Sequence, residues 1–134
     1  MTVSDQMTPD PVTVAPDTGL IEIRALFRRH KFRHVPVVDG GRLAGVVSDR
    51  DVLAAVSPFL DTPSETRRDV GTLSATAADL MTADVRTVAA DAPLADAVRL
   101  MVDAGVSSLV VTDGGGALAG ILTARDVLRA SAGA

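Results

Sequence analysis

The pattern of apolar and polar positions switches between two periods along the chain, and the same succession occurs twice. Short aliphatic runs at 11–14 and 85–88 predict strands. Each run is followed by apolar residues at helical spacing, which predicts an amphipathic helix. The apolar face consists of Leu20, Ile23 and Phe27 in the first stretch and of Leu94, Ala97, Val98 and Met101 in the second.

Each predicted helix is followed by two aliphatic strands around a glycine-rich turn, which is the pattern of a β-hairpin. A short helix then closes each stretch. The hairpin strands are expected at 34–38 and 43–48 and at 108–112 and 118–123, and the closing helices carry Val52, Leu53 and Val56 or Val127 and Leu128. Each stretch therefore predicts a β-α-β-β-α unit, and the fold class is α/β, in the form of an α+β sandwich.

The two stretches are copies of one another. Met7 and Thr8 recur as Met81 and Thr82, and the copies span residues 2–56 and 76–130. The intervening residues 57–75 are rich in Pro, Ser, Thr and Gly, which is typical of a linker. About 55 residues bury too little apolar surface for a stable core. We therefore expect one domain over residues 1–134, with the two repeats packed about a pseudo-twofold axis.

Composition narrows the class of protein. The 134 residues are 47% hydrophobic and 22% charged, which is typical of a globular protein, and no apolar run is long enough to cross a membrane. The N-terminus lacks the pattern of a signal peptide, so a cytoplasmic location is expected. The frequent Ala, Val, Asp and Arg residues indicate a GC-rich bacterial genome.

Several chemistries are disfavoured. The absence of cysteine excludes disulfides and thiolate sites, and two histidines are too few for a histidine-rich metal site. The net charge of −4 and the three aromatic residues argue against nucleic-acid binding. Neither histidine has the context of a nucleophile and its base, so the chain is not expected to be an enzyme.

The same hydroxyl-x-x-carboxylate pattern stands at two strand-to-helix junctions, as Ser48 with Asp51 and Thr123 with Asp126. One interpretation is a capping box, which needs no ligand. The other is a ligand site, because helix N-termini at strand ends bind anions and nucleotide hydroxyls. Arg50 and Arg125 follow the hydroxyl residues by two positions. A nearby phosphate would explain them, and so would plain solvation at the surface.

The ordered motifs resemble the cystathionine-β-synthase (CBS) domain, and two in tandem resemble the Bateman module. The motifs are the paired Met-Thr-x-x-x-x-Thr-Val, the run Val-Pro-Val-Val-Asp-Gly and the paired Gly-aliphatic-aliphatic-Ser/Thr-x-x-Asp. The resemblance covers nearly the whole chain. It implies a regulatory module that binds AMP, ADP, ATP or S-adenosylmethionine in clefts between the repeats, with no obligatory cofactor and with or without Mg²⁺. It also implies a homodimer of modules and a protein target that receives the signal in trans.

The resemblance also implies roles for individual residues. The two acids would accept hydrogen bonds from ribose hydroxyls, and the hydroxyl residues would contact ribose or phosphate. Residues at the start of the first strand would meet the adenine, and basic residues entering the second strand would meet phosphate. The acids are Asp51 and Asp126, and the hydroxyl residues are Ser48 and Thr123. The positions expected at the adenine are Val12 and Arg86, and the basic residues expected at phosphate are Arg33 and His34.

The two predicted sites differ in charge. Arg33 and His34 correspond to Ser107 and Ser108 in the second copy, so the first site is expected to hold phosphate better. Arg86 either completes the second site or blocks it. His34 has a plainer interpretation as a surface or packing residue. If the hydroxyl-acid pairs are only caps, the alternative function is an interaction or oligomerisation scaffold without a ligand.

Overall fold

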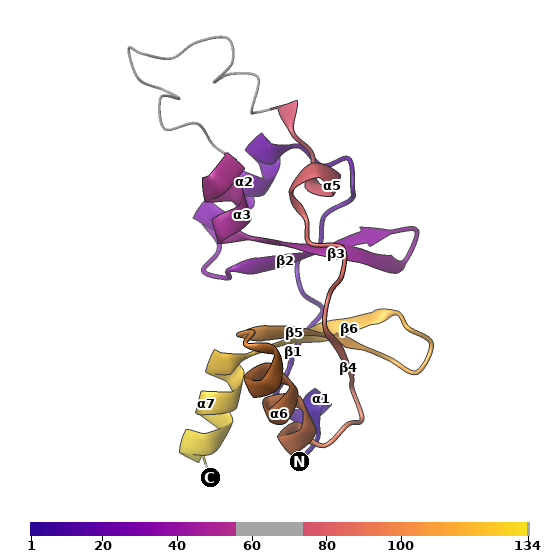
Figure 1. Cartoon of the computed structure of the whole chain (residues 1–134), viewed down its shortest axis with the longest axis vertical. Coiled ribbons are helices and arrows are strands. Elements are labelled where there is room, and N and C mark those ends of the chain that lie inside the picture. The colour runs from indigo at the N-terminus through magenta and orange to yellow at the C-terminus, as the bar shows by residue number, and fades with distance from the viewer. Residues whose placement is uncertain (56–73, 134) are drawn as a thin grey trace. The chain divides into compact units, whose positions relative to one another are not determined.

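The computed structural model describes residues 1–55 and 74–133. Most of the predicted linker, and Val56 with it, lies outside the described residues. The elements are α1 (Val3–Gln6), β1 (Thr8–Pro9), α2 (Leu20–Arg29), β2 (His34–Asp39), β3 (Arg42–Ser48), α3 (Asp49–Ala55), α5 (Ala77–Leu80), β4 (Thr87–Ala89), α6 (Leu94–Ala104), β5 (Ser108–Thr112), β6 (Leu118–Thr123) and α7 (Ala124–Gly133) (Figure 1). The predicted helices and hairpins are present in both repeats, so the α/β class is confirmed.

The first strand of each repeat is shorter than predicted, and the two copies differ. The second repeat has β4, whereas in the first repeat Val14 forms only an isolated parallel bridge with Val37. The backbone N–H of Val110 donates to the Arg86 carbonyl at 3.3 Å. Pro36 stands at the position that corresponds to Val110, and proline has no N–H to donate. The strand predicted at 11–14 is therefore reduced to the bridge at Val14.

Apolar residues of the predicted helix faces lie in two separate cores. Leu20 and Ile23 of α2 pack with β2 and β3 in the first, and Ala97 and Met101 of α6 pack with β5 and β6 in the second. The first core rests on the two-stranded sheet β2-β3, and the second on a four-stranded sheet of order β1-β6-β5-β4.

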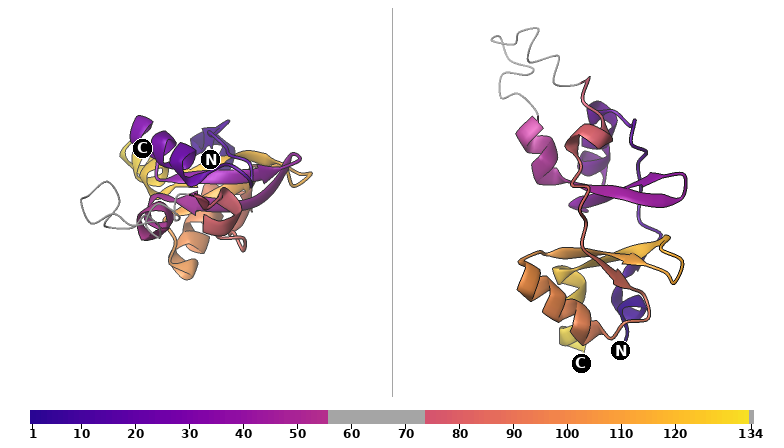
Figure 2. Two further views of the ribbon diagram at one scale, coloured as in Figure 1. Left: turned by 90° about the horizontal axis from the view of Figure 1, so that it is seen from above. Right: turned by 45° about the vertical axis from the view of Figure 1, so that its right-hand side comes forward.

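The compact units differ from the sequence repeats, because the opening segment of each repeat packs with the body of the other. One unit contains residues 1–11, 41–43 and 84–134, and the other contains 12–40 and 44–83. β1 of the first repeat pairs antiparallel with β6 of the second, where Thr8 faces Ile121. In the other unit, Thr82 and Val46 exchange two backbone hydrogen bonds of 3.0 and 3.1 Å. Helix α1 contacts α6 and α7 (Figure 2).

The glycine of the repeated strand motif makes this docking possible. A Cβ atom at Gly45 would lie 2.7 Å from the carbonyl oxygen of Thr82, and one at Gly120 would lie 2.6 Å from that of Thr8. Such distances are too short for any side chain to be accepted without backbone movement. In each unit, the glycine of one repeat's strand motif thus contacts the Met-Thr motif of the other repeat.

Helices α1 and α5 were not predicted. Each has four residues, which is too short to show a helical period. Their starts carry a signal nevertheless, since the Thr2 N–H donates to Asp5 at 2.8 Å and the Thr76 N–H donates to Asp79 at 2.9 Å. This is the same hydroxyl-x-x-acid spacing that marks the starts of α3 and α7.

Candidate functional site

Both hydroxyl-acid pairs form capping boxes at the point where a strand runs directly into a helix. In the first repeat, the Ser48 N–H donates to Asp51 Oδ2 at 2.8 Å and the Asp51 N–H donates to Ser48 Oγ at 3.1 Å. The corresponding distances between Thr123 and Asp126 are 3.0 and 3.2 Å. The capping interpretation is therefore confirmed at both junctions. Each carboxylate keeps one oxygen, Oδ1, that the cap does not use.

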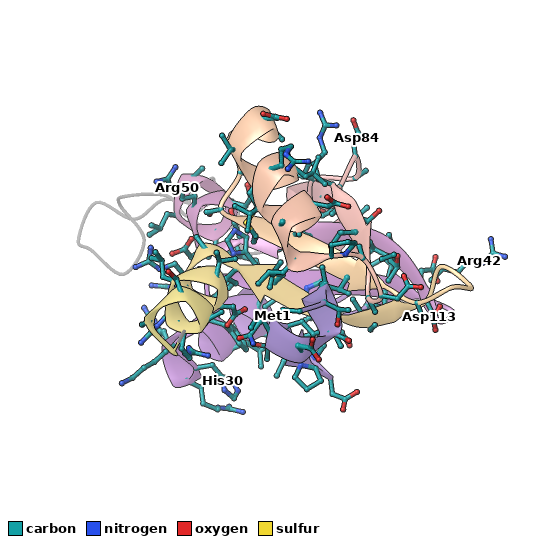
Figure 3. The ribbon with its side chains drawn as sticks, turned by 90° about the horizontal axis from the view of Figure 1, so that it is seen from below. Met1, His30, Arg42, Arg50, Asp84 and Asp113 are labelled. Carbon is teal, nitrogen blue, oxygen red and sulfur yellow. The ribbon has the colours of Figure 1, made fainter. Side chains whose placement is uncertain are left out.

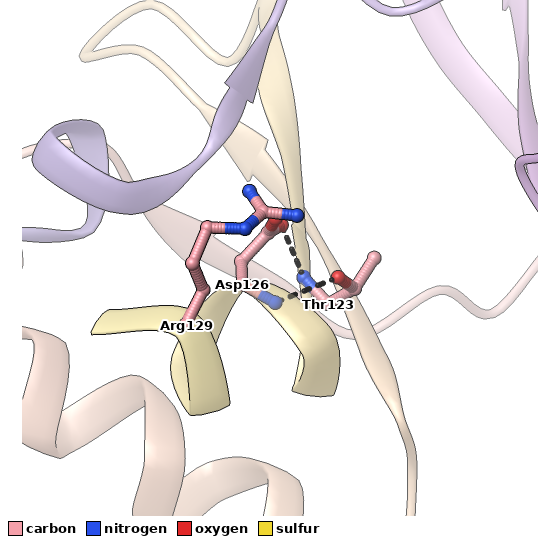
Figure 4. A network of polar contacts seen from close by, with 3 residues as sticks. All are labelled: Thr123, Asp126 and Arg129. Carbon is pink, nitrogen blue, oxygen red and sulfur yellow. Dashed lines mark hydrogen bonds and ion pairs between the residues drawn. The ribbon is translucent and has the colours of Figure 1, made fainter. Parts of the chain in front are cut away.

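The two remaining oxygens have different surroundings. Asp51 is half-buried, and its Oδ1 has no hydrogen-bond partner among residues 1–55 and 74–133. Asp126 is only 4% exposed, and Nη1 of Arg129 lies 3.5 Å from its Oδ1. Figure 4 shows the Arg129 guanidinium beside the Asp126 carboxylate. The second acid is thus engaged at both oxygens and the first at only one.

The backbone of Arg33 and the side chain of His34 lie next to the Ser48–Asp51 corner. The Asp49 N–H donates to the Arg33 carbonyl at 2.9 Å, which joins the start of β2 to the start of α3. Burial lowers the pKa of His34, while Asp49 and Asp51 act in the opposite direction and raise it. These carboxylates are therefore close enough to His34 to act on its charge. Arg33 is exposed, so its positive charge is available at this edge.

The remaining predicted residues lie near the two corners. In the described part of the chain, their side chains form no hydrogen bond or ion pair with the corner residues. Val12 is 38% exposed and precedes the bridge at Val14 by two residues. Arg86 is exposed and directly precedes β4. Because β4 runs parallel to β5, its start lies at the end of the sheet where Ser108 pairs with Thr123. Arg50 and Arg125 are exposed on the first turns of α3 and α7.

Arg129 is the contact residue that the sequence analysis missed. Its signal is the spacing of three from Asp126 on one helix, which brings the two side chains to the same face. The first repeat has Ala54 at the corresponding position. Among the described residues there is no cluster of three or more metal-ligating side chains. None of the described helices is long and apolar enough to span a membrane.

Comparison with known proteins follows the same division of the chain. The profile of the CBS domain matches residues 3–58 and again 77–133. A curated relative, the chloroplastic CBS domain-containing protein CBSX2 of Arabidopsis thaliana, is 33% identical over 150 residues, which is 97% of this chain and 63% of that protein. Inosine-5'-monophosphate dehydrogenase of Mycobacterium leprae is 33% identical over 125 residues, which is 92% of this chain but 21% of the enzyme.

The chain thus spans less than two thirds of the length of these curated relatives. Among solved structures, the crystal structure of CBSX2 in complex with AMP superposes with a TM-score of 0.81. Its sequence is 35% identical, and the match covers 97% of this chain and 95% of that one.

Proposed function

Because the chain belongs to the CBS domain family, we propose that it is a non-enzymatic regulatory module that binds an adenosine-containing ligand. The observation that carries the proposal is the corner of the first repeat, where the half-buried Asp51 carboxylate has one oxygen that no described residue engages, close to Arg33 and His34. The similarity to CBSX2, which was crystallised with AMP, supports adenosine as the recognised group.

The capping box leaves the right atoms for a nucleotide. Asp51 Oδ2 is occupied by the Ser48 N–H, so Oδ1 is the oxygen that would accept a ribose hydroxyl. Ser48 Oγ accepts from the Asp51 N–H, and its own hydrogen can therefore be donated to ribose or phosphate. Arg33 and Arg50 would attract the phosphate, and Val12 would offer an apolar contact to the adenine.

In the second repeat the corresponding roles fall to Thr123, Asp126, Arg86 and Arg125. Here a ribose hydroxyl would have to displace Arg129 from a carboxylate that is almost completely buried. We therefore propose that the first corner is the stronger site. Mg²⁺ would accompany a ligand with several phosphates. A homodimer of modules, a cytoplasmic location and a protein target in trans belong to the same proposal.

A thermal-shift screen with AMP, ADP, ATP and S-adenosylmethionine, each with and without Mg²⁺, tests the proposal. A ligand at one hundred times its dissociation constant adds about 2.7 kcal/mol of stability. For a domain of this size that raises the melting temperature by several degrees. If none of these compounds raises it, the alternative of a scaffold without a ligand is favoured.

The variant Asp51→Asn makes the screen specific to the corner. Asparagine keeps one oxygen for the Ser48 N–H and replaces the other by an amide group that cannot accept a ribose hydrogen. We expect it to abolish most of the shift. The control is Asp103→Asn, since Asp103 is exposed on α6 and has no hydrogen bond or ion pair within the described ranges. An equal loss in both variants would contradict the proposed site.

A further inference from the structure

One short segment holds much of the positive charge of this acidic chain. Residues 24–34 contain five Arg or Lys residues and no acid, although the whole chain has a net charge of −4. The remaining residues therefore carry a net charge of −9. We name the five side chains the α2 basic face: Arg24, Arg28, Arg29, Lys31 and Arg33.

The α2 basic face is mostly exposed and forms no ion pair with the described residues. Leu20 and Ile23 turn the opposite side of α2 into the core, which leaves Arg28 and Arg29 exposed. Lys31 and Arg33 are also exposed, and Arg24 is half-buried. Within residues 1–55 and 74–133, the ion pairs are Arg99–Asp96 and Arg129–Asp126, and neither involves this face.

Ring contacts give the loop after α2 a defined shape. The rings of His30 and Phe32 stack with centroids 4.9 Å apart, and Phe27 meets Phe32 edge-on at 5.7 Å. Figure 3 shows His30 at the edge of the molecule, pointing away from the ribbon. Phe32 also packs against the first core, so apolar contacts hold the loop that carries Lys31 and Arg33 to the body of the unit. Such contacts lower the entropic cost of ordering the loop on a partner.

The second repeat shows that the fold does not require these cations. The positions on and after α6 that correspond to the α2 basic face hold Val98, Val102, Asp103, Gly105 and Ser107. The helix dipole favours cations in a last turn, and this would account for Arg28 and Arg29. Yet α6 carries Asp103 there and extends over eleven residues, one more than α2. The corresponding helix therefore forms without these cations, which leaves the charge of the first repeat available for another role.

We propose that the α2 basic face docks a short acidic segment of a partner protein. Arginine binds carboxylates with two parallel hydrogen bonds, so a surface rich in arginine fits Asp and Glu side chains. The ten residues of α2 span about 15 Å. A nucleic-acid strand carries a charge every 3.4 Å or so and would continue onto the acidic remainder of the chain, which repels it. A short acidic segment can end where the cations end.

The test uses the full chain and a fluorescein-labelled peptide of ten residues that contains six Glu or Asp, followed by anisotropy. The variant Arg28→Gln/Arg29→Gln removes two charges from the face. The matched control Arg42→Gln/Arg99→Gln removes two charges elsewhere. We expect the first pair to weaken binding about ten-fold, given the usual contribution of exposed ion pairs, and the control to leave it nearly unchanged.

Two results would overturn the proposal. One is an equal effect of the two double variants, which would show that only net charge matters. The other is tighter binding of a ten-nucleotide oligouridylate than of the peptide, lost in Arg28→Gln/Arg29→Gln, which would assign the face to nucleic acid. The nucleotide thermal shift of the same variants is measured separately, so failure here leaves the adenosine site untouched, and the reverse also holds.

Discussion

The corners of the two repeats are built on the same capping box and differ in what surrounds it. Asp51 and Asp126 each accept the N–H of a hydroxyl residue three positions earlier, at 2.8 and 3.0 Å. The second oxygen is unengaged within the described residues in the first repeat and faces Arg129 in the second. The repeated motif thus secures the helix start in both copies, whereas the proposed difference in ligand binding rests on residues outside the motif.

The largest expected effect concerns stability. Asp126→Ala removes a helix cap made by a buried carboxylate and leaves the half-buried Thr123 N–H without its partner, which together should lower the free energy of unfolding by about 3 kcal/mol. Asp51→Ala removes a cap at a half-buried site and should cost about 1 kcal/mol. Urea unfolding of the two variants measures both values. Equal losses of unfolding free energy in the two variants would contradict the proposed difference between the corners.

The next effect concerns nucleotide affinity, for which the Asp51 variant should lose more than the Asp126 variant. Asp51→Asn should weaken binding of the best ligand from the screen by about 2 kcal/mol, or roughly 30-fold, which is the scale of a hydrogen bond to a charged group. Asp126→Asn should change it less than about three-fold, because its second oxygen already has a partner. Isothermal titration calorimetry decides between this outcome and a symmetrical loss.

A variant at Arg129 tests whether this side chain is what closes the second corner. Its side chain is 68% exposed, so its ion pair with Asp126 is screened by solvent and should contribute only about 0.5 kcal/mol to stability. Arg129→Gln frees Asp126 Oδ1 at little cost to the fold. We expect the ligand stoichiometry in calorimetry to rise from near one towards two per chain. An unchanged stoichiometry would mean that burial of Asp126, rather than Arg129, closes the second corner.

The smallest effect is a pH dependence confined to the first repeat. Burial lowers the pKa of His34 in the folded chain below its ordinary value, so the unfolded chain binds the proton more readily. The contribution of His34 to stability is complete above the ordinary pKa and decreases as the pH falls through it. His34→Gln should flatten the loss of melting temperature between pH 7 and about 5.5. His30→Gln, at an exposed ring, is the control.

Local signals in the sequence predicted much of the fold and the site. Period and turn residues located the helices and hairpins, and the Ser48–Asp51 spacing predicted a cap that the structure contains. The bond from the Asp49 N–H to the Arg33 carbonyl brings the backbone of Arg33 to this corner, and the phosphate contact that the resemblance implies for Arg33 stays a prediction. The strand predicted at 11–14 is reduced to the bridge at Val14 because Pro36 lacks the N–H that Val110 donates to Arg86 in the second repeat.

Local patterns were enough to predict the two copies, their main elements and the caps of α3 and α7, because each depends on residues within a few positions of one another. Only the tertiary structure decided that each opening segment packs with the body of the other copy, where Thr8 meets β6 and Thr82 meets β3. It also decided that Asp126 is buried while Asp51 is not. Both features join residues distant in the chain, and identical local patterns carry no information about such contacts.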